Sequence, residues 1–512
     1  MRAKRRTLLY GAALTPVAGV LAACGNDQKT AQNGGGTTFI SMDSHRIDEA
    51  EAVREPGTVR EFELTAAPAT VDLGGTEVDT WAYDGRVHGP ELRIKKGERL
   101  KATLSNDLDE GTGIHWHGIA LRCDMDGVTG VTQKEIAPGE TFTYEFTAPH
   151  PGTHWYHPHT GYQLDRGLYG PLIVEDPDEE VTWDEEWVLL LDDWLDGTGT
   201  TPDETAAKLR DGMDHGDMGH GDMDMGGSEE GDPSQSVLGE DAGDVEYPHF
   251  LINGRTSADP DRLELRPGSR VRLRVINAGG DTAFRLAVGG HRLTVTHTDG
   301  FAVEPVEVDS ILLGMGERYD AIVEVGEGVF PVVAHAEGKG AMGRALLDTG
   351  SGSDPAADER PAELDGKLLA YADLSPAEGT ELEPGEPDRT IDFALTGGMM
   401  DYDWGINGRQ GDHEGMYPVE EGERVRLRFR NETIMWHPMH LHGHTFALAD
   451  SGVRKDTAVV LPGETVEVDF TADNPGRWMV HCHNLYHNEV GMMTLLGYLD
   501  PDGEEGTVLG TE

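Results

Sequence analysis

One pattern of turns and strands occurs three times along the 512-residue chain. Each copy has a small Asp-Gly or Asn-Gly turn, a second turn that contains Gly, and a run in which apolar and polar residues alternate. These runs lie at 100–104, 271–275 and 425–429. A further Gly-Glu turn and alternating run follow at 142–146, 321–325 and 466–470. Alternation with a period of two is typical of strands with one buried face. The repeat therefore predicts three β-sandwich domains in tandem.

The repeat also gives the expected domain boundaries, which are 45–180, 245–375 and 385–500. Residues 196–245 are rich in Gly and Asp, and residues 350–365 and 374–389 are acidic and rich in Pro, so we expect linkers or surface loops there. Apolar residues make up 37% of the chain, beside 68 glycines and 27 prolines. This composition favours an all-β protein over a helical one.

The charge is strongly unbalanced, with 41 basic and 94 acidic residues and a net charge of −53. Such a surface repels nucleic acid and anionic lipid, so a nucleic-acid-binding function is excluded. The simplest interpretation of the acidity is solvation, including adaptation to a salty medium.

The N-terminal residues are predicted to be an export signal. Arg2, Lys4, Arg5 and Arg6 precede an apolar run at 8–20 that is too short to span a bilayer. The run ends in Leu21-Ala22-Ala23-Cys24, which resembles a bacterial lipobox, and Arg5-Arg6 resembles a twin-arginine signal. We therefore expect a lipoprotein-type signal over 1–24, a flexible tether over 25–44 and no membrane contact except a lipid anchor. An ordinary cleaved secretory signal is the alternative.

The three cysteines predict no disulfide framework. Cys24 belongs to the signal, and Cys482 lies between two histidines, which suggests a metal site. Cys123 is then left alone, and it is expected to be a small buried residue.

Four His-x-His pairs are the strongest sign of chemistry, namely His115/His117, His157/His159, His440/His442 and His481/His483. Residues i and i+2 of a strand point to the same face, about 6.5–7 Å apart, so each pair can place two imidazoles in one cavity. A single pair would be weak support for a metal, because histidine is often structural or exposed. Four pairs make a metal site the better interpretation.

The repeat relates these pairs to one another. A shift of 324 residues places His157 and His159 on His481 and His483, and a shift of 325 places His115 and His117 on His440 and His442. The middle domain has no such pair. The sequence thus predicts one eight-histidine site between the first and third domains. Eight imidazoles exceed the needs of one ion, so we expect a cluster of copper-like metals.

A second site is predicted near the C-terminus, where Cys482 is followed by His487 and Met492, and where His437 precedes His440. A thiolate, two imidazoles and a weak thioether are the ligands of a blue-copper centre. On a strand, Cys482 points away from the face shared by His481 and His483. One strand therefore reaches both sites. Core packing is the alternative role of Met492.

Together these motifs, over residues 75–500, resemble those of the multicopper oxidases, which include laccases and bacterial copper-resistance oxidases. The resemblance implies cupredoxin-like Greek-key sandwiches and four copper ions. It implies that electrons taken singly from a reducing substrate reduce dioxygen to water in a four-electron step. The implied type 1 ligands are His437, Cys482, His487 and Met492, and the type 2 ligands are His115 and His440. The two type 3 ions are implied to be bound by His117, His157 and His483, and by His159, His442 and His481.

Two acidic residues are candidates for proton delivery to dioxygen. Asp126 matches an acidic residue that family members place near the cluster, although an Asp-Gly turn explains it equally well. Glu489 could be a second relay, but relatives often carry Glu directly after the type 1 histidine, where this chain has Asn488. His154 and His444 match no ligand position.

The segment 211–225 is unusual because Met213, Met218 and Met223 recur every five residues, with His215 and His220 between them. Thioethers select Cu(I) and imidazoles suit Cu(II), so copper binding is favoured over an acidic linker. The expected reductant is Cu(I) or a phenol, with a possible role in copper tolerance. The alternative is an exported copper-binding or storage protein without catalysis. A copper nitrite reductase fits less well, since it lacks the eight-histidine cluster. The sequence leaves the oligomeric state open.

Overall fold

The computed structural model describes residues 38–54, 57–211, 236–239, 241–382, 385–411 and 415–501. Within these ranges no helix combines the length and the apolar character needed to cross a membrane. The predicted export signal, most of the tether and nearly all of the Met/His segment 211–225 lie outside the described residues.

The first domain is built from two four-stranded sheets. One has the order β2-β1-β4-β6 and the other the order β3-β8-β7-β5. The strands are β1 (Val59–Asp72), β2 (Glu77–Tyr83), β3 (Leu92–Lys95), β4 (Arg99–Asn106), β5 (His115–His117), β6 (Thr141–Thr147), β7 (Gly152–His157) and β8 (Gly170–Glu175). In β4 the alternate residues Leu100, Ala102 and Leu104 are buried, as the sequence pattern predicts.

The middle domain has a six-stranded sheet in the order β10-β9-β12-β17-β14-β15 and a five-stranded sheet in the order β11-β19-β18-β13-β16. Its strands are β9 (Glu185–Trp194), β10 (His249–Ile252), β11 (Arg262–Glu264), β12 (Arg270–Asn277), β13 (Phe284–Val288), β14 (Leu293–Thr298), β15 (Phe301–Val308), β16 (Ser310–Leu313), β17 (Arg318–Glu324), β18 (Val329–Ala336) and β19 (Ala341–Asp348).

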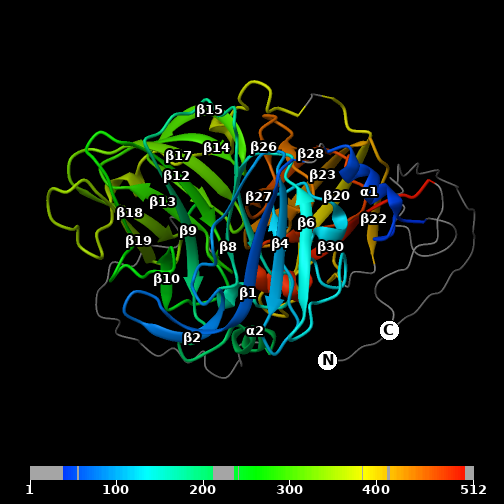
Figure 1. The fold of residues 1–512 in the computed structure, drawn as a ribbon, viewed down its shortest axis with the longest axis horizontal. Helices are drawn as coiled ribbons and strands as arrows, with labels where there is room; N and C mark the ends of the chain where they lie inside the picture. The colour runs from blue at the N-terminus through cyan, green and yellow to red at the C-terminus, as the bar shows by residue number, and fades with distance from the viewer. Residues whose placement is uncertain are drawn as a thin grey trace, which may run out of the picture. The chain divides into compact units, whose positions relative to one another are not determined.

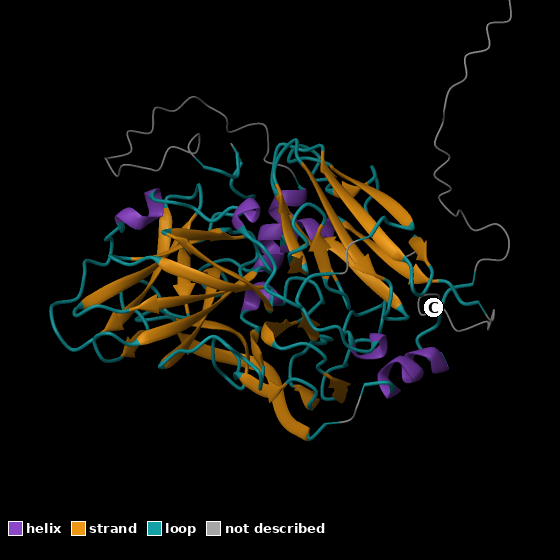
Figure 2. Ribbon diagram, turned by 90° about the horizontal axis from the view of Figure 1, so that it is seen from above, coloured by secondary structure: helices purple, strands orange, loops and turns teal. Residues whose placement is uncertain are grey.

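The third domain repeats this architecture with sheets β21-β20-β23-β28-β25-β26 and β22-β30-β29-β24-β27. Its strands are β20 (Arg389–Thr396), β21 (Gly405–Ile406), β22 (Met416–Val419), β23 (Arg424–Asn431), β24 (His437–Leu441), β25 (Phe446–Leu448), β26 (Arg454–Lys455), β27 (Thr457–Val460), β28 (Thr465–Thr471), β29 (Arg477–Cys482) and β30 (Met493–Tyr498). The prediction of an all-β fold with three sandwich domains is confirmed, and Figure 2 shows how few helices accompany the strands.

The repeated sequence pattern corresponds to a repeated strand arrangement. In each domain the strand of the first alternating run pairs in parallel with an earlier strand and antiparallel with the strand of the second run. These trios are β1-β4-β6, β9-β12-β17 and β20-β23-β28. The three domains therefore share one architecture, which is why equivalent histidines occupy equivalent strands.

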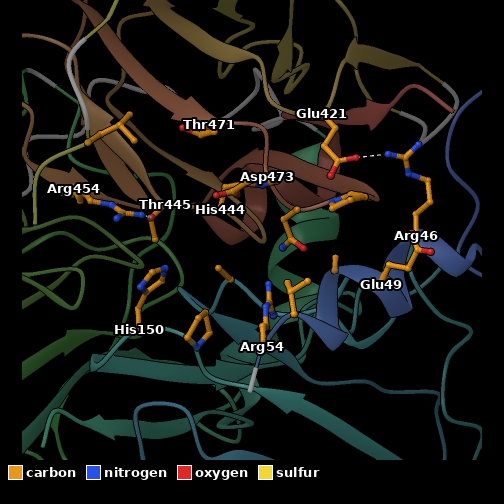
Figure 3. A pocket seen from close by; sticks show the side chains of 17 residues that line it. Arg46, Glu49, Arg54, His150, Glu421, His444, Thr445, Arg454, Thr471 and Asp473 are labelled. Atoms are coloured by element: carbon orange, nitrogen blue, oxygen red, sulfur yellow. Dashed lines mark hydrogen bonds and ion pairs between the residues drawn. The ribbon is translucent and has the colours of Figure 1, made fainter. Parts of the chain in front are cut away.

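The described residues also form short helices, namely α1 (His45–Ala52), α2 (Pro202–Arg210) and α3 (Leu485–Val490), with single 3-10 turns η1 (Cys123–Met125), η2 (Leu164–Arg166), η4 (Ala362–Asp365) and η5 (Tyr371–Asp373). Helix α2 lies in the segment expected to be a linker. Helix α1 borders a cavity of about 510 Å³ that is lined by charged residues of the first and third domains (Figure 3).

The tether expected over 25–44 ends earlier than predicted. Phe39 forms a β-bridge with Leu499, and the amide of Ile40 donates to the carbonyl of Tyr498 at 2.9 Å. The side chain of Ile40 is fully buried. These residues are therefore part of the packed fold, because an apolar side chain and a paired backbone stabilise them there.

The first and third domains are in direct contact through residues that are more than 300 positions apart in the sequence. The side-chain amide of Asn474 donates to the carbonyl of Leu121, and one continuous buried core includes residues of all three domains. Figure 1 shows the strands of the three domains, coloured from blue at the N-terminus to red at the C-terminus. This contact brings β5 and β7 close to β24 and β29, the strands that carry the histidine pairs.

Candidate metal centre

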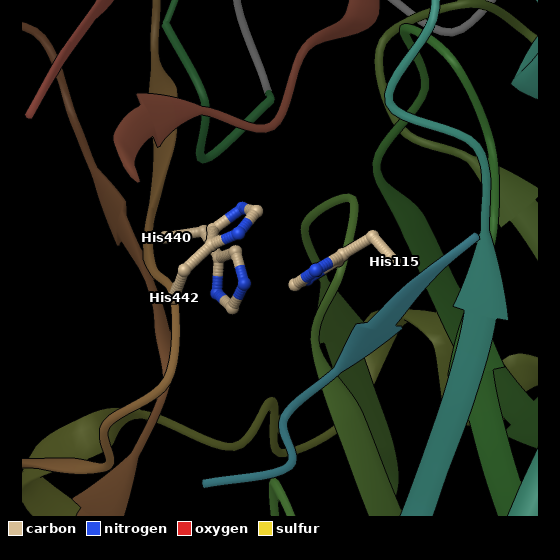
Figure 4. A group of neighbouring side chains, drawn as sticks. All are labelled: His115, His440 and His442. Carbon is tan, nitrogen blue, oxygen red and sulfur yellow. The ribbon is translucent and has the colours of Figure 1, made fainter. Parts of the chain in front are cut away.

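The eight paired histidines meet in one place. His115 on β5 is opposite His157 on β7, and His440 on β24 is opposite His481 on β29. Between the domains, the rings of His115 and His442 stack with centroids 3.8 Å apart, as do those of His117 and His440. Figure 4 shows His115 facing His440 and His442 across the domain boundary. The single site predicted between the first and third domains is thus present.

Most of these imidazoles have one ring nitrogen without a partner among the described residues. The unpartnered buried atoms are Nε2 of His115, His157, His159 and His440, Nδ1 of His117 and both nitrogens of His483. Nε2 of His442 lies 3.1 Å from Nε2 of His481. Buried polar atoms are normally satisfied, so this cluster of free nitrogens fits bound metal ions.

In four of these rings, one ring nitrogen faces an oxygen acceptor of Asp126 or Asp456. Asp126 uses its carbonyl oxygen for Nδ1 of His115 at 3.0 Å and its carboxylate for Nδ1 of His442 at 3.0 Å. Asp456 uses its carbonyl oxygen for Nδ1 of His440 at 2.8 Å and its carboxylate for Nε2 of His117 at 3.1 Å. Each aspartate thus orients one histidine of its own domain and one of the other domain. Such contacts direct the remaining nitrogen towards a metal.

The protonation state also suits metal binding. Burial, followed by the neighbouring imidazoles, lowers the pKa of His117, His440 and His442 well below the ordinary value. Burial lowers the pKa of His481 to about 3. The rings are therefore neutral at pH 7, which is the form that binds metals.

The potential ligand atoms form overlapping groups whose members lie within 4.8 Å of one another. These groups are His159/His442/His481, His115/His117/His157 and His115/His440/His442. The first is one of the ligand sets implied by the family resemblance. The second and third groups share His115, and the first and third share His442. The eight paired histidines therefore enclose one continuous space, which we call the cage.

The second predicted site lies beside this cage. Sγ of Cys482 is 3.6 Å from Nδ1 of His437 and 3.7 Å from Nδ1 of His487. All three side chains are fully buried. Met492 is also buried, and its carbonyl oxygen accepts a hydrogen bond from the amide of Cys482 at 3.0 Å.

The opposite orientations predicted for neighbouring residues of β29 are confirmed. Cys482 contacts His437 and His487, whereas the ring of His481 lies 4.8 Å from that of His159 and 5.1 Å from that of His442. The two sites are therefore joined by adjacent residues of one strand.

Comparison with known proteins agrees with this geometry. Three multicopper oxidase family models match residues 65–179, 185–351 and 385–498. The chain is 45% identical to the multicopper oxidase MmcO of Mycobacterium tuberculosis, and the match covers 94% of both chains.

The chain belongs to the multicopper oxidase family.

Further similarities extend this result. Copper resistance protein A of Escherichia coli is 29% identical to the chain, over 96% of this chain and 98% of that protein. The laccase of Botrytis aclada is 26% identical with a TM-score of 0.73, over 92% of each chain. A multi-copper oxidase of Pseudomonas thermotolerans is 30% identical with a TM-score of 0.65, covering 86% of this chain and all of that chain. The protein is a copper-dependent oxidoreductase that uses dioxygen and a reducing substrate.

The two predicted proton-relay residues of the oxidase occupy different surroundings. Asp126 is fully buried between His115 and His442. Glu489 lines a small cavity of about 10 Å³ next to His157, His159, His481 and His483. That volume is close to what one water molecule requires. Burial raises the pKa of Glu489 to about 7.

Sequence reasoning missed two acidic residues that hold site histidines. Asp456 contacts His117 and His440 as described above. Oδ2 of Asp244 accepts a hydrogen bond from Nε2 of His487 at 2.9 Å, and both side chains are fully buried. Each is a single aspartate outside any motif, so no local signal marked it.

The other two histidines of the motifs are not part of the groups of ligand atoms. Nδ1 of His444 faces the carbonyl oxygen of His442 at 3.1 Å, and its Nε2 faces the hydroxyl of Tyr498 at 2.7 Å. His154 is fully buried beside Gly118 and Gly300.

Proposed function

We propose that the cage of eight histidines binds three copper ions and that the Cys482 site binds a fourth. The free nitrogens that face one another across the domain boundary carry this proposal. The type 1 ligands would be His437, Cys482, His487 and Met492. His115 and His440 would bind the type 2 ion, with the type 3 ions bound by His117, His157 and His483, and by His159, His442 and His481. Bound copper would supply one-electron acceptance at type 1 and four-electron delivery to dioxygen at the cluster.

The protein's own contribution to this chemistry is orientation and exclusion of water. Asp126 and Asp456 fix the rings of four cage histidines, and burial lowers the pKa of His117, His440 and His442 so that these rings stay neutral. Cys482 is covalently attached to His481 and His483, which makes one strand the shortest connection between the sites. We further propose Asp126 and Glu489 as the residues that hold and deliver protons.

The proposed reductant is Cu(I), with phenols as a second class. Soft thioether ligands in segment 211–225 and the similarity to proteins named copper resistance protein A support Cu(I). Near the proposed type 1 site, Trp404 lies 4.3 Å from the ring of His487, and Met400 in the same loop is 84% exposed. Ile434, three residues before His437, is 71% exposed. Exposed apolar side chains in the segments that carry Trp404 and His437 also suit an aromatic substrate.

Deletion of residues 211–225 tests the choice between these reductants. We expect the rate of Cu(I) oxidation to fall several-fold while the rate with a phenol is unchanged. A second variant replaces Met213, Met218, Met223 and Met225 by Leu, which keeps the length of the segment and removes its thioethers. Equal retention of both activities in both variants would contradict a copper-specific role for the segment.

Replacement of Met492 by Leu tests the proposed axial ligand. The type 1 reduction potential should rise, because loss of a weak thioether ligand destabilises the oxidised copper. A redox titration of the blue absorption measures the change. Met479→Leu, which alters another buried methionine of the same domain, serves as the control and should leave the potential as it is. An unchanged potential in Met492→Leu would exclude ligation.

We also propose that the protein is exported and anchored through a lipid on Cys24, on the basis of the sequence at 2–24. Cys24→Ser should move the enzyme from the membrane fraction to the soluble extracytoplasmic fraction. Retention of the variant with membranes would contradict the anchor.

A further inference from the structure

The middle domain contributes none of the cage histidines, yet its backbone touches two of them. Gly316, in the loop between β16 and β17, has a φ of +86°. A Cβ atom at this position would lie 2.9 Å from Cδ2 of His483 and 3.0 Å from Cε1 of His117. Only a residue without a side chain allows this close approach. The loop therefore forms one wall of the cage.

Two residues further along, Arg318 extends from the middle domain to both other domains. Its Nη1 and Nη2 donate to Oδ1 and Oδ2 of Asp456 at 2.6 and 2.7 Å. Its Nε donates to the carbonyl oxygen of Thr153 at 3.0 Å. Arg318 and Asp456 are both fully buried. One guanidinium group thus connects a strand of the first domain with a carboxylate of the third.

Asp456, which Arg318 holds, in turn contacts two histidines of the cage. The Oδ1 atom that accepts from Arg318 also lies 3.1 Å from Nε2 of His117, and the carbonyl oxygen of Asp456 faces Nδ1 of His440. The rings of His117 and His440 are the ones that stack across the domain boundary. The orientation of both rings therefore depends on where Asp456 is held.

The residue after His117 is Gly118, and its lack of a side chain leaves room for the ion pair of Arg318 and Asp456. Gly118 has a φ of +82°, and a Cβ atom there would overlap Nη2 of Arg318 and lie 2.8 Å from Oδ2 of Asp456. The ion pair therefore occupies space that any other residue at position 118 would fill.

A second buried cation supports the same loop. Nζ of Lys455 lies 3.1 Å from carboxylate oxygens of both Asp299 and Glu317, and all three side chains are buried. Asp299 also lies 3.6 Å from Arg318. The residues before Arg318 and before Asp456 are thus paired with each other, which holds the two chain segments in register.

We propose that the middle domain is a positioning element for the metal cluster, with Arg318 as its principal residue. Arg318 holds Asp456 in the place from which Asp456 orients His117 and His440. This inference rests on the proposed function, because it takes His117 and His440 to be copper ligands. Arg318 and Asp456 are positioning residues, since each acts on the metal site through a histidine.

Arg318→Lys is the most direct test, because lysine keeps the positive charge but cannot form the two parallel hydrogen bonds to a carboxylate. Arg272→Lys is the matched control. Arg272 lies in the same domain, is 2% exposed and donates to Oδ2 of Asp320 from Nε at 3.1 Å and Nη2 at 2.6 Å. Its two carboxylate partners are Asp320 and Glu179, and neither of them pairs with a cage histidine within the described residues. Asp456→Asn, which preserves side-chain size, is the second variant.

Copper content per chain and the type 2 electron paramagnetic resonance signal are measured on the purified, copper-loaded enzymes. The blue type 1 absorption reports that each variant is folded. We expect Arg318→Lys and Asp456→Asn to lose at least half of the type 2 signal, or to shift its hyperfine splitting, with the blue absorption retained. Arg272→Lys should match the wild type.

A wild-type copper content and type 2 signal in Arg318→Lys would overturn the inference. If Arg318→Lys lacks the blue absorption, Asp456→Asn decides, and a normal type 2 signal in that variant would also overturn it. Absence of a type 2 signal in the wild-type enzyme itself would refute the copper assignment, and the positioning role with it.

Discussion

At the scale of single residues, the site depends on acceptors that hold one nitrogen of an imidazole and leave the other free, as in His115, His117 and His440. Asp126 and Asp456 act in the same way from opposite sides of the cage, each combining a backbone carbonyl and a carboxylate. A neutral imidazole donates from one nitrogen only, so an acceptor at that nitrogen determines which one faces the metal. The two aspartates are therefore as important for geometry as the ligands themselves.

Asp126→Asn tests whether Asp126 delivers protons in addition to orienting His115 and His442. Asparagine retains the size of the side chain and an acceptor oxygen but cannot carry a proton, so reoxidation of the reduced enzyme by dioxygen should slow by about 100-fold. Anaerobic reduction of the blue absorption by a phenol should be unaffected. Both rates are measured by stopped flow. Asp124→Asn is the control, because Asp124 lies in the same turn and pairs with Arg122. Equal reoxidation rates in all three proteins would exclude Asp126 as a relay.

His150 makes the stability of the enzyme sensitive to acid. It lines the cavity of Figure 3, and burial followed by the positive charge of Arg454 lowers its pKa from 6.5 to about 3. The folded protein therefore keeps His150 neutral, while the unfolded chain binds a proton below pH 6.5. The resulting stability is complete above pH 6.5 and is lost as the pH falls towards 3.

Between pH 7 and pH 5 this single group should cost up to about 2 kcal/mol, or roughly 2 °C in Tm for a chain of this size. The drop in Tm between these two pH values should be smaller by that amount in His150→Gln, as measured by calorimetry. An identical drop in both proteins would show that His150 is not neutral in the folded state.

At the scale of secondary structure, paired strands bring distant residues together, and a short helix is held in place by contacts with a sandwich. Helix α1 is attached to the first domain by Glu51, whose Oε1 accepts from the amide of Thr147 at 3.0 Å and from its hydroxyl at 2.7 Å. Glu51 is 5% exposed and also pairs with Arg54. A short isolated helix is unstable in water, so α1 depends on such contacts.

Glu51→Ala should therefore release α1 without unfolding the sandwich. The change leaves the buried amide of Thr147 without its acceptor, which costs about 1–3 kcal/mol. Hydrogen exchange at residues 45–52 should become at least tenfold faster, while exchange in β4 and β6 stays slow. Glu49→Ala, at an exposed position of the same helix, is the control. Unchanged protection in Glu51→Ala would mean that apolar contacts such as those of Ile47 hold the helix alone.

At the scale of the whole molecule, the excess of acidic residues produces repulsion at the surface, whereas charges in the interior are paired. The net charge of −53 resides mainly on the surface, where it promotes solubility but produces self-repulsion. Inside, Arg318 and Lys455 are paired with three carboxylates at the junction of the domains. Salt screens the exposed charges strongly and the buried ones much less.

Added salt should therefore stabilise the enzyme. Raising NaCl from 0.1 to 1 M shortens the screening length from about 10 to about 3 Å, so repulsion between surface carboxylates weakens and Tm should rise by a few degrees. Sucrose at the same osmolality distinguishes screening from general exclusion effects, and the salt should have the larger effect. A fall in Tm with NaCl would show that the surface ion pairs outweigh the repulsion.

The sequence alone determined the class of fold, the histidine pairs and the Cys482 site. Alternating strands and repeated turns are local patterns, and the period of two fixes which neighbours share a face wherever the strand lies. The orientation of Cys482 against His481 was predictable for that reason. The tether predicted from the sequence includes Phe39 and Ile40, which are packed, because their anchoring partners, such as Tyr498, are at the other end of the chain.

Only the tertiary structure decided what surrounds the cage. The contact between Arg318 and Asp456 joins residues 138 positions apart, and the contact between Asp456 and His117 joins residues 339 apart. Each partner is a single polar residue in an ordinary strand or loop, so no periodicity or motif relates them. Contacts of this kind arise when whole sandwiches pack, and the packed arrangement alone reveals that the middle domain, which has no His-x-His pair, contacts the histidine cage.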